Sequence, residues 1–136
     1  MEPSEDPKLI ELAHEVFDMA RRGEAARLGA YVDAGVPVDM MNAAGDTLVM
    51  LAAYHGHAEA VSRLVERGAD VNLRNDRGQS PLAGAVFKSE DDVVKVLLAA
   101  GADPDAGTPS ARDTAKMFGQ QQYESWFGAT VSDQVD

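Results

Sequence analysis

The sequence predicts an all-α solenoid in which about four helix-turn-helix units stack in a row. Gly35, Gly68 and Gly101 lie 33 residues apart, and each is followed four residues later by Asp or Asn. A second series has the same spacing, because residues 45–53 correspond to residues 78–86. The repeat therefore comprises the whole unit and is not limited to a single turn within it. Because such arrays bury side chains between neighbouring units, we expect function on a surface and not in a closed pocket.

The first unit is predicted to be a capping repeat. Asp6 supplies an N-cap carboxylate and Pro7 takes the first helical position, after which apolar residues recur at helical spacing as far as Arg22. Gly23 turns the chain into a second helix at residues 25–34, which a left-handed glycine ends. The solvent side of the first helix carries charges, as the end of an array requires: Lys8, Glu11, Glu15 and Asp18.

The second and third units are regular. We expect inner helices at residues 47–54 and 80–87, and outer helices at residues 58–67 and 90–100. Ala52 and Ala53 are small, which lets two helices and the next unit approach closely. Ser89 has Asp92 three residues later, and this pair predicts a capping box for the last of these helices.

The fourth unit is irregular. Residues 110–115 align on residues 80–85 with an offset of 30 in place of 33, so the preceding loop has lost about three residues. Residues 107–109 are predicted to form a tight substitute turn, before a last outer helix at residues 120–127. The predicted boundaries are a disordered segment at 1–6, units at 7–41, 42–74, 75–107 and 108–127, and an acidic, frayed tail at 128–136.

The repeated unit resembles the ankyrin repeat. The unit from Asn42 to Arg74 matches the family pattern at Thr47, Ala52, Ala53, Gly56, His57, Val61, Leu64, Gly68, Ala69, Asp70 and Asn72. Four positions depart from the pattern: Leu48 stands for Pro, Met50 and Ala83 for His, and Ser89 for Gly. The resemblance covers about residues 8–127 and implies helix pairs joined by short β-turn loops, called fingers, together with a protein partner. Free-standing bacterial members of the family are often this small, and the composition favours a bacterial source.

The composition argues against several kinds of site and several classes of partner. The chain has 136 residues and no cysteine, which removes disulfides and thiolate zinc sites. A formal charge of -11 argues against binding to nucleic acid or to anionic membranes. The acidic residues 1–6 precede no apolar run, so we expect neither a signal peptide nor a membrane span, and a cytoplasmic location.

Catalytic and metal-binding patterns are absent from the sequence. The three histidines are His14, His55 and His57, and the resemblance implies that His57 ties backbone between helices. His55 and His57 lack a third ligand at zinc spacing, and residues 103–107 begin like a calcium loop without its bidentate Glu. We therefore expect no enzyme activity, no metal and no cofactor.

The candidate site is the concave face, which the resemblance assigns to the fingers and to the exposed side of the inner helices. Repeat register places 13 predicted partner-binding residues there: Arg21, Arg22, Met41, Asp46, Tyr54, His55, Arg74, Arg77, Gln79, Phe87, Lys88, Met117 and Phe118. Five of these are basic, out of 12 basic residues in an acidic chain. Arginine and aromatic residues together are typical of binding hot spots. An alternative for Phe87, Met117 and Phe118 is packing between units.

The sequence thus predicts a monomeric protein-interaction module whose partner protein presents an acidic and apolar patch. An alternative is an inhibitor or a chaperone-like accessory protein of one specific enzyme. Charged residues of the outer helices, such as Glu59, Arg63 and Asp92, are predicted to form a solvated face without function.

Overall fold

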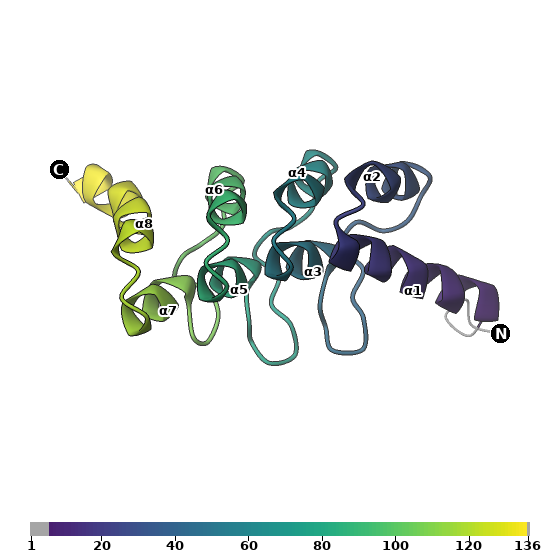
Figure 1. The fold of residues 1–136 in the computed structure, drawn as a ribbon, viewed down its shortest axis with the longest axis horizontal. Coiled ribbons are helices and arrows are strands. Elements are labelled where there is room, and N and C mark those ends of the chain that lie inside the picture. The colour runs from purple at the N-terminus through teal and green to yellow at the C-terminus, as the bar shows by residue number, and fades with distance from the viewer. Residues whose placement is uncertain (1–5, 136) are drawn as a thin grey trace.

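The computed structural model describes residues 6–135 of the chain, and within them it contains eight α-helices. Their bounds are α1 Pro7–Arg22, α2 Ala25–Asp33, α3 Leu48–Tyr54, α4 Ala58–Glu66, α5 Pro81–Phe87, α6 Asp91–Ala99, α7 Ala111–Met117 and α8 Gln121–Val135. Inner helices α1, α3, α5 and α7 form one layer and outer helices α2, α4, α6 and α8 the other (Figure 1). Each helix packs against its partner in the same unit, and the inner helices also pack against one another along the array. The all-α solenoid predicted from the 33-residue period is confirmed.

Side-chain caps start all four inner helices where the sequence predicts. The Asp6 carboxylate accepts a hydrogen bond from the Lys8 amide at 2.9 Å, and the Thr47 hydroxyl accepts one from the Met50 amide at 3.1 Å. Ser80 and Ser110 cap α5 and α7 in the same way, each at 3.1 Å. A cap satisfies a backbone N–H that the first turn leaves without a partner. The starts of these helices are therefore set by residues adjacent to them.

The capping box expected at Ser89 is wrong. Ser89 has a φ of 57°, and the N-cap of α6 is Glu90, whose side chain makes no capping hydrogen bond. The corresponding positions after the other inner helices are Gly23, Gly56 and Gly119, all with positive φ. Ser89 is thus the residue that makes the left-handed turn of its unit, and its hydroxyl accepts a hydrogen bond from Gln120.

Hydrogen bonds between units connect the helix layers. The Nε2 atom of His57 lies 2.8 Å from the Arg21 carbonyl oxygen, which can only accept, so Nε2 donates. The predicted structural role of His57 is confirmed. In the last unit the Gln120 amide takes the equivalent place, donating to the Val86 carbonyl at 3.0 Å and to the Ser89 hydroxyl at 2.9 Å.

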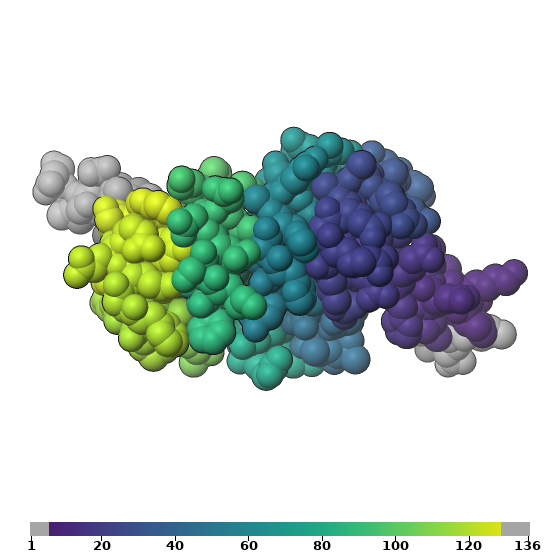
Figure 2. Space-filling model, in the orientation of Figure 1, coloured from purple at the N-terminus to yellow at the C-terminus, as the bar shows by residue number. Residues whose placement is uncertain are grey.

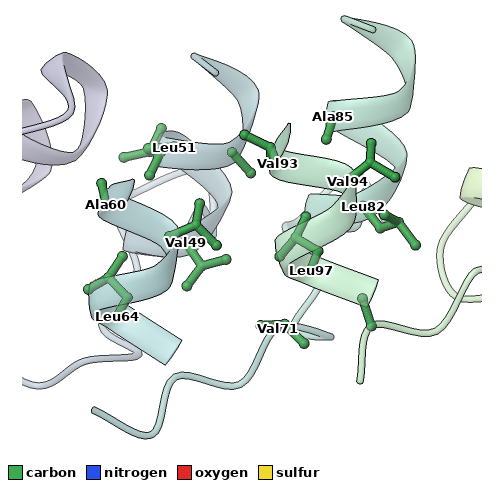
Figure 3. Close-up of a cluster of buried hydrophobic side chains, with 14 of the residues drawn as sticks. Val49, Leu51, Ala60, Leu64, Val71, Leu82, Ala85, Val93, Val94 and Leu97 are labelled. Atoms are coloured by element: carbon green, nitrogen blue, oxygen red, sulfur yellow. The ribbon is translucent and has the colours of Figure 1, made fainter. Parts of the chain in front are cut away.

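The core runs through all units without interruption. Leu64, Val94 and Leu97 are fully buried between neighbouring helix pairs, as Figure 3 shows for the central units. In the last unit Tyr123 and Phe127 are also fully buried, and the Tyr123 hydroxyl donates to the Asp91 carboxylate. Burial and the Asp91 carboxylate raise the pKa of Tyr123, so its hydroxyl keeps its proton.

Both ends of the array differ from their predicted form. At the first end Leu9 and Ile10 are 47% and 42% exposed, and Leu9 lines a depression of about 480 Å³ between α1, α2 and the first finger, so the polar cap is incomplete. At the other end α8 continues beyond Phe127 to Val135, because Gly128 does not take a positive φ and no proline follows. Of the segment predicted to be disordered, residues 1–6, only Asp6 is described, as the N-cap of α1, and residues 1–5 and 136 lie outside the described residues.

The Gly84→Ala variant is expected to be more stable than the wild type by about 0.5 to 1 kcal/mol, because alanine is the better residue inside a helix. A Cβ at Gly84, inside α5, would meet only the Tyr54 ring, at 3.5 Å, which is an ordinary contact. Urea denaturation should show a higher midpoint with an unchanged slope.

Gly29→Ala in α2 is the matched control. Its Cβ would lie 3.0 Å from the Arg67 guanidinium carbon and would disturb the Arg67–Asp33 ion pair, so its gain should be smaller. A lower midpoint for Gly84→Ala would mean that α5 needs glycine at this position for its packing.

Candidate interaction surface

Three fingers project on the same side of the array, beyond the inner helices (Figure 1). They are the loops of residues 34–47, 67–80 and 100–110, between each outer helix and the next inner helix. Backbone hydrogen bonds link neighbouring fingers, since the Asp76 amide donates to the Ala44 carbonyl at 3.0 Å and the Thr108 amide to the Gly78 carbonyl at 2.9 Å. Figure 2 shows the units packed against one another along the array. The fingers therefore form a connected edge of the molecule.

Asn75 organises the second finger. Its side-chain oxygen accepts from the amides of Arg77 and Gln79, each at 3.0 Å, and its amide donates to the side chains of Asp46 and Gln79 at 2.9 and 2.7 Å. Asn75 is buried, and the prediction of site residues missed it. The repeat register could have found it, because Asn42 is 33 residues earlier and makes the same turn contacts in the first finger.

Two adjoining hollows lie on the concave face, that is, on the fingers and the exposed side of the inner helices. The first, the apolar hollow, measures about 290 Å³ and is lined by Met50, Tyr54, Gln79, Ala83, Gly84, Phe87, Pro109, Thr114, Met117 and Phe118. The second, the polar hollow, measures about 280 Å³ and is lined by Asp46, Met50, Leu51, Tyr54, Asn75, Arg77 and Gln79. Met50, Tyr54 and Gln79 belong to both, so the two hollows are continuous.

Large apolar side chains are exposed around the apolar hollow. Tyr54 is 40% exposed, Phe87 54%, Phe118 56% and Met117 64%. The rings of Phe87 and Phe118 meet edge to face, with centroids 5.6 Å apart. The packing alternative for these residues thus accounts for one ring contact between the last two units, but Phe87 and Phe118 each remain more than half exposed.

Lys88, Tyr54 and His55 form a cationic and aromatic cluster at the ends of α3 and α5. The Lys88 Nζ atom lies 4.8 Å from the centre of the Tyr54 ring, and the His55 ring meets that of Tyr54 edge to face at 5.5 Å. Burial lowers the pKa of His55, and so do the positive charges of His57, Lys88 and Arg21. A lowered pKa favours the neutral form of His55, so Lys88 supplies the positive charge of this cluster.

Arginine pairing differs between the second finger and the rest of the chain. Six of the eight arginines form ion pairs: Arg21, Arg22, Arg27, Arg63, Arg67 and Arg112. Arg74 and Arg77 make no ion pair with any described residue, although the chain contains 23 Asp and Glu residues. Both are exposed, so their guanidinium groups are available to a partner.

The structure gathers some of the 13 predicted residues and not others. Seven line the two hollows: Asp46, Tyr54, Arg77, Gln79, Phe87, Met117 and Phe118. Arg21 and Arg22 are exposed at the end of α1, but their side chains pair with Asp18 at 2.7 Å and Glu24 at 2.6 Å. Met41 is half exposed in the first finger and lines neither hollow. The hollow floors contain residues that the prediction missed, among them Met50 and Gly84.

No group of three or more His, Asp or Glu side chains in the described part of the chain is arranged to hold a metal ion. Within residues 6–135, none of the helices has the length and apolar character needed to cross a membrane.

Known proteins resemble this chain in sequence and in fold. A family model described as ankyrin repeats in three copies matches residues 17–108. An ankyrin repeat protein of Pseudomonas aeruginosa, PA3287, is 45% identical over 56 residues, which cover 41% of this chain and 33% of that protein. The crystal structure of the human ASB11 ankyrin repeat domain matches with a TM-score of 0.75 and 24% identity, over 85% of this chain and 53% of that one. The chain thus spans about a third of the bacterial relative and about half of the human domain.

Proposed function

This chain belongs to the ankyrin repeat family, and from that premise we propose that it is a protein-interaction module that binds one partner protein through the concave face. Ankyrin repeats are in general protein–protein interaction modules and are typically not enzymes. The observation that carries the proposal for this chain is the position of Arg77 beside two continuous hollows, without an ion pair to any described residue.

The partner's surface should be acidic and apolar. A protein with a formal charge of -11 repels acidic partners in general, so an unpaired arginine and lysine on one face provide local attraction against that background. Tyr54, Phe87, Met117 and Phe118 supply exposed apolar area beside these cations. Interfaces of this composition concentrate binding energy in a few central residues. The proposed compartment is the cytoplasm, and the proposed module is a monomer.

Preorganisation supports tight binding by this face. Asn75 holds Asp46, Arg77 and Gln79 by hydrogen bonds, and backbone bonds join the fingers to one another. Because little of this surface has to become ordered when a partner arrives, less conformational entropy is lost on binding.

The proposal is tested by capturing partners from a native lysate and measuring the affinity of the stoichiometric one. Arg77→Glu and Tyr54→Ala are each expected to weaken binding by at least about 1 kcal/mol, because they remove the unpaired cation and the ring shared by both hollows. Arg77→Glu should also slow association and reduce its salt dependence. Calorimetry and stopped-flow measurements at two salt concentrations provide these values.

Glu59→Lys and Asp92→Lys on the outer helices are the controls. Both side chains are exposed, on α4 and α6, so they should leave the affinity within about 0.5 kcal/mol of the wild type. Equal losses from both pairs of variants, or losses from the outer pair alone, would show that the partner does not use the concave face.

A further inference from the structure

We propose that the apolar hollow is an anchor pocket for one large apolar side chain, carried by a short acidic segment of the partner protein. The inference rests on the proposed function. It assigns the binding to one pocket of the concave face and to one kind of peptide. Its three supports are the size and lining of the hollow, the glycine in its floor, and the cations at its rim.

The hollow has the size and the lining for a side chain. Its volume of about 290 Å³ is at the lower end of ligand pockets, which range over about 300–1,000 Å³. Its walls are Tyr54, Phe87, Met117 and Phe118, from the ends of three successive inner helices. These residues are between 40% and 64% exposed. An inserted aliphatic or aromatic group would remove their apolar area from water, and this burial would stabilise the complex.

The floor of the hollow is open because Gly84 has no side chain. Gly84 lies inside α5, between Ala83 and the buried Ala85, and a Cβ built on it would point to the Tyr54 ring at 3.5 Å. Alanine fits there without a clash, and yet it would take up part of the space at the foot of Tyr54. A substitution of Gly84 by alanine can therefore make the pocket shallower without destabilising the fold.

Cations lie at the rim on two sides. Lys88 places its ammonium over the Tyr54 ring at 4.8 Å, and Arg77 lines the polar hollow that continues from the apolar one. Asp46 is the one carboxylate that lines either hollow, and its Oδ1 already accepts a hydrogen bond from Asn75. Carboxylates that flank an inserted apolar side chain would therefore meet unpaired cations. This charge complementarity selects an acidic segment.

The first experiment selects peptides from a random display library on the immobilised full chain. We expect the enriched peptides to share one Leu, Ile, Met, Phe or Trp with Asp or Glu within a few positions on either side. Enrichment of basic peptides, enrichment of apolar peptides without acidic residues, or no enrichment above a blank surface would overturn the proposal.

The second experiment measures the affinity of the best selected peptide by fluorescence anisotropy. Lys88→Glu is expected to weaken it about tenfold, which corresponds to about 1.4 kcal/mol. Lys95→Glu is the matched control, because Lys95 also lies over a ring, that of Trp126 at 5.4 Å, but on the outer helix α6. Gly84→Ala should weaken binding at least about threefold, although it stabilises the helix. Equal losses for the two lysine variants, or full affinity in Gly84→Ala, would contradict an anchor in this pocket.

Binding measurements with the native partner distinguish a failure of this inference from a failure of the proposed function. Partner binding could be lost in Arg77→Glu and Tyr54→Ala but complete in Lys88→Glu and Gly84→Ala. That result would support binding through the concave face and refute the anchor pocket. Sedimentation of the free chain tests a second copy as the occupant. A dimer that dissociates when the selected peptide is added would also refute the proposal, because the pocket would then serve self-association.

Discussion

Replacement of Gly23 by alanine is expected to destabilise the fold by about 2 to 3 kcal/mol, one of the two largest effects that we predict for a single substitution. Gly23 has a φ of 73°, a left-handed conformation that costs a residue with a Cβ about 1 to 2 kcal/mol. The new Cβ would also lie 2.5 Å from the Cγ atom of His57, so the imidazole must move away. That movement breaks its hydrogen bond to the Arg21 carbonyl, which contributes about 1 kcal/mol more.

Gly119→Ala separates the two contributions. Gly119 follows α7 as Gly23 follows α1, and its φ of 65° is similar, but a Cβ there would meet nothing within 4 Å. This control should therefore lose only the backbone part, about 1 to 2 kcal/mol. Urea denaturation followed by circular dichroism measures both. Equal losses of stability in the two variants would mean that the His57 hydrogen bond does not stabilise the interface between the first two units.

Leu64→Ala is expected to cost about 2 to 5 kcal/mol, because it leaves a cavity at the centre of the array. Leu64 lies in α4, is fully buried, and belongs to the core that runs through the units (Figure 3). In a solenoid each unit is stabilised by its neighbours, so a central cavity should weaken both halves. The denaturation midpoint from circular dichroism gives the loss.

Val65→Ala, at the next position of α4, is the control for Leu64→Ala. Val65 is half-buried, and its truncation should cost about 1 kcal/mol or less. The single tryptophan, Trp126 in α8, reports on the last unit alone. A midpoint for Leu64→Ala close to that of Val65→Ala would show that the units relax around the cavity. Different midpoints by tryptophan fluorescence and by circular dichroism would show that the two halves unfold separately.

The candidate site was predictable in position and only partly in composition. Repeat register places Tyr54, Phe87 and Met117 at equivalent ends of successive inner helices, and the structure finds all three around one hollow. The register alone could not show that Arg22 pairs with Glu24 while Arg77 stays unpaired, because side-chain pairing depends on what lies opposite in space. Whether a partner uses these residues stays a prediction.

The sequence by itself determined the repeat architecture and the starts of the inner helices. Thr47, Ser80 and Ser110 cap helices with hydrogen bonds to amides three residues later, and such bonds need no distant partner. A period of 33 residues likewise gives each unit the same neighbours along the chain, which is sufficient for stacking.

Only the tertiary structure decided how the irregular positions are used. Ser89 makes a left-handed turn and accepts from Gln120 in place of capping α6, because the next unit supplies the amide that binds its hydroxyl. The open floor at Gly84 is a hollow because side chains of three units surround it at a distance. Contacts of this kind join residues about 30 positions apart, as the bond between Asn75 and Asp46 does, and they depend on the angle at which units stack. That angle is set by packing across the whole array, which local sequence patterns do not encode.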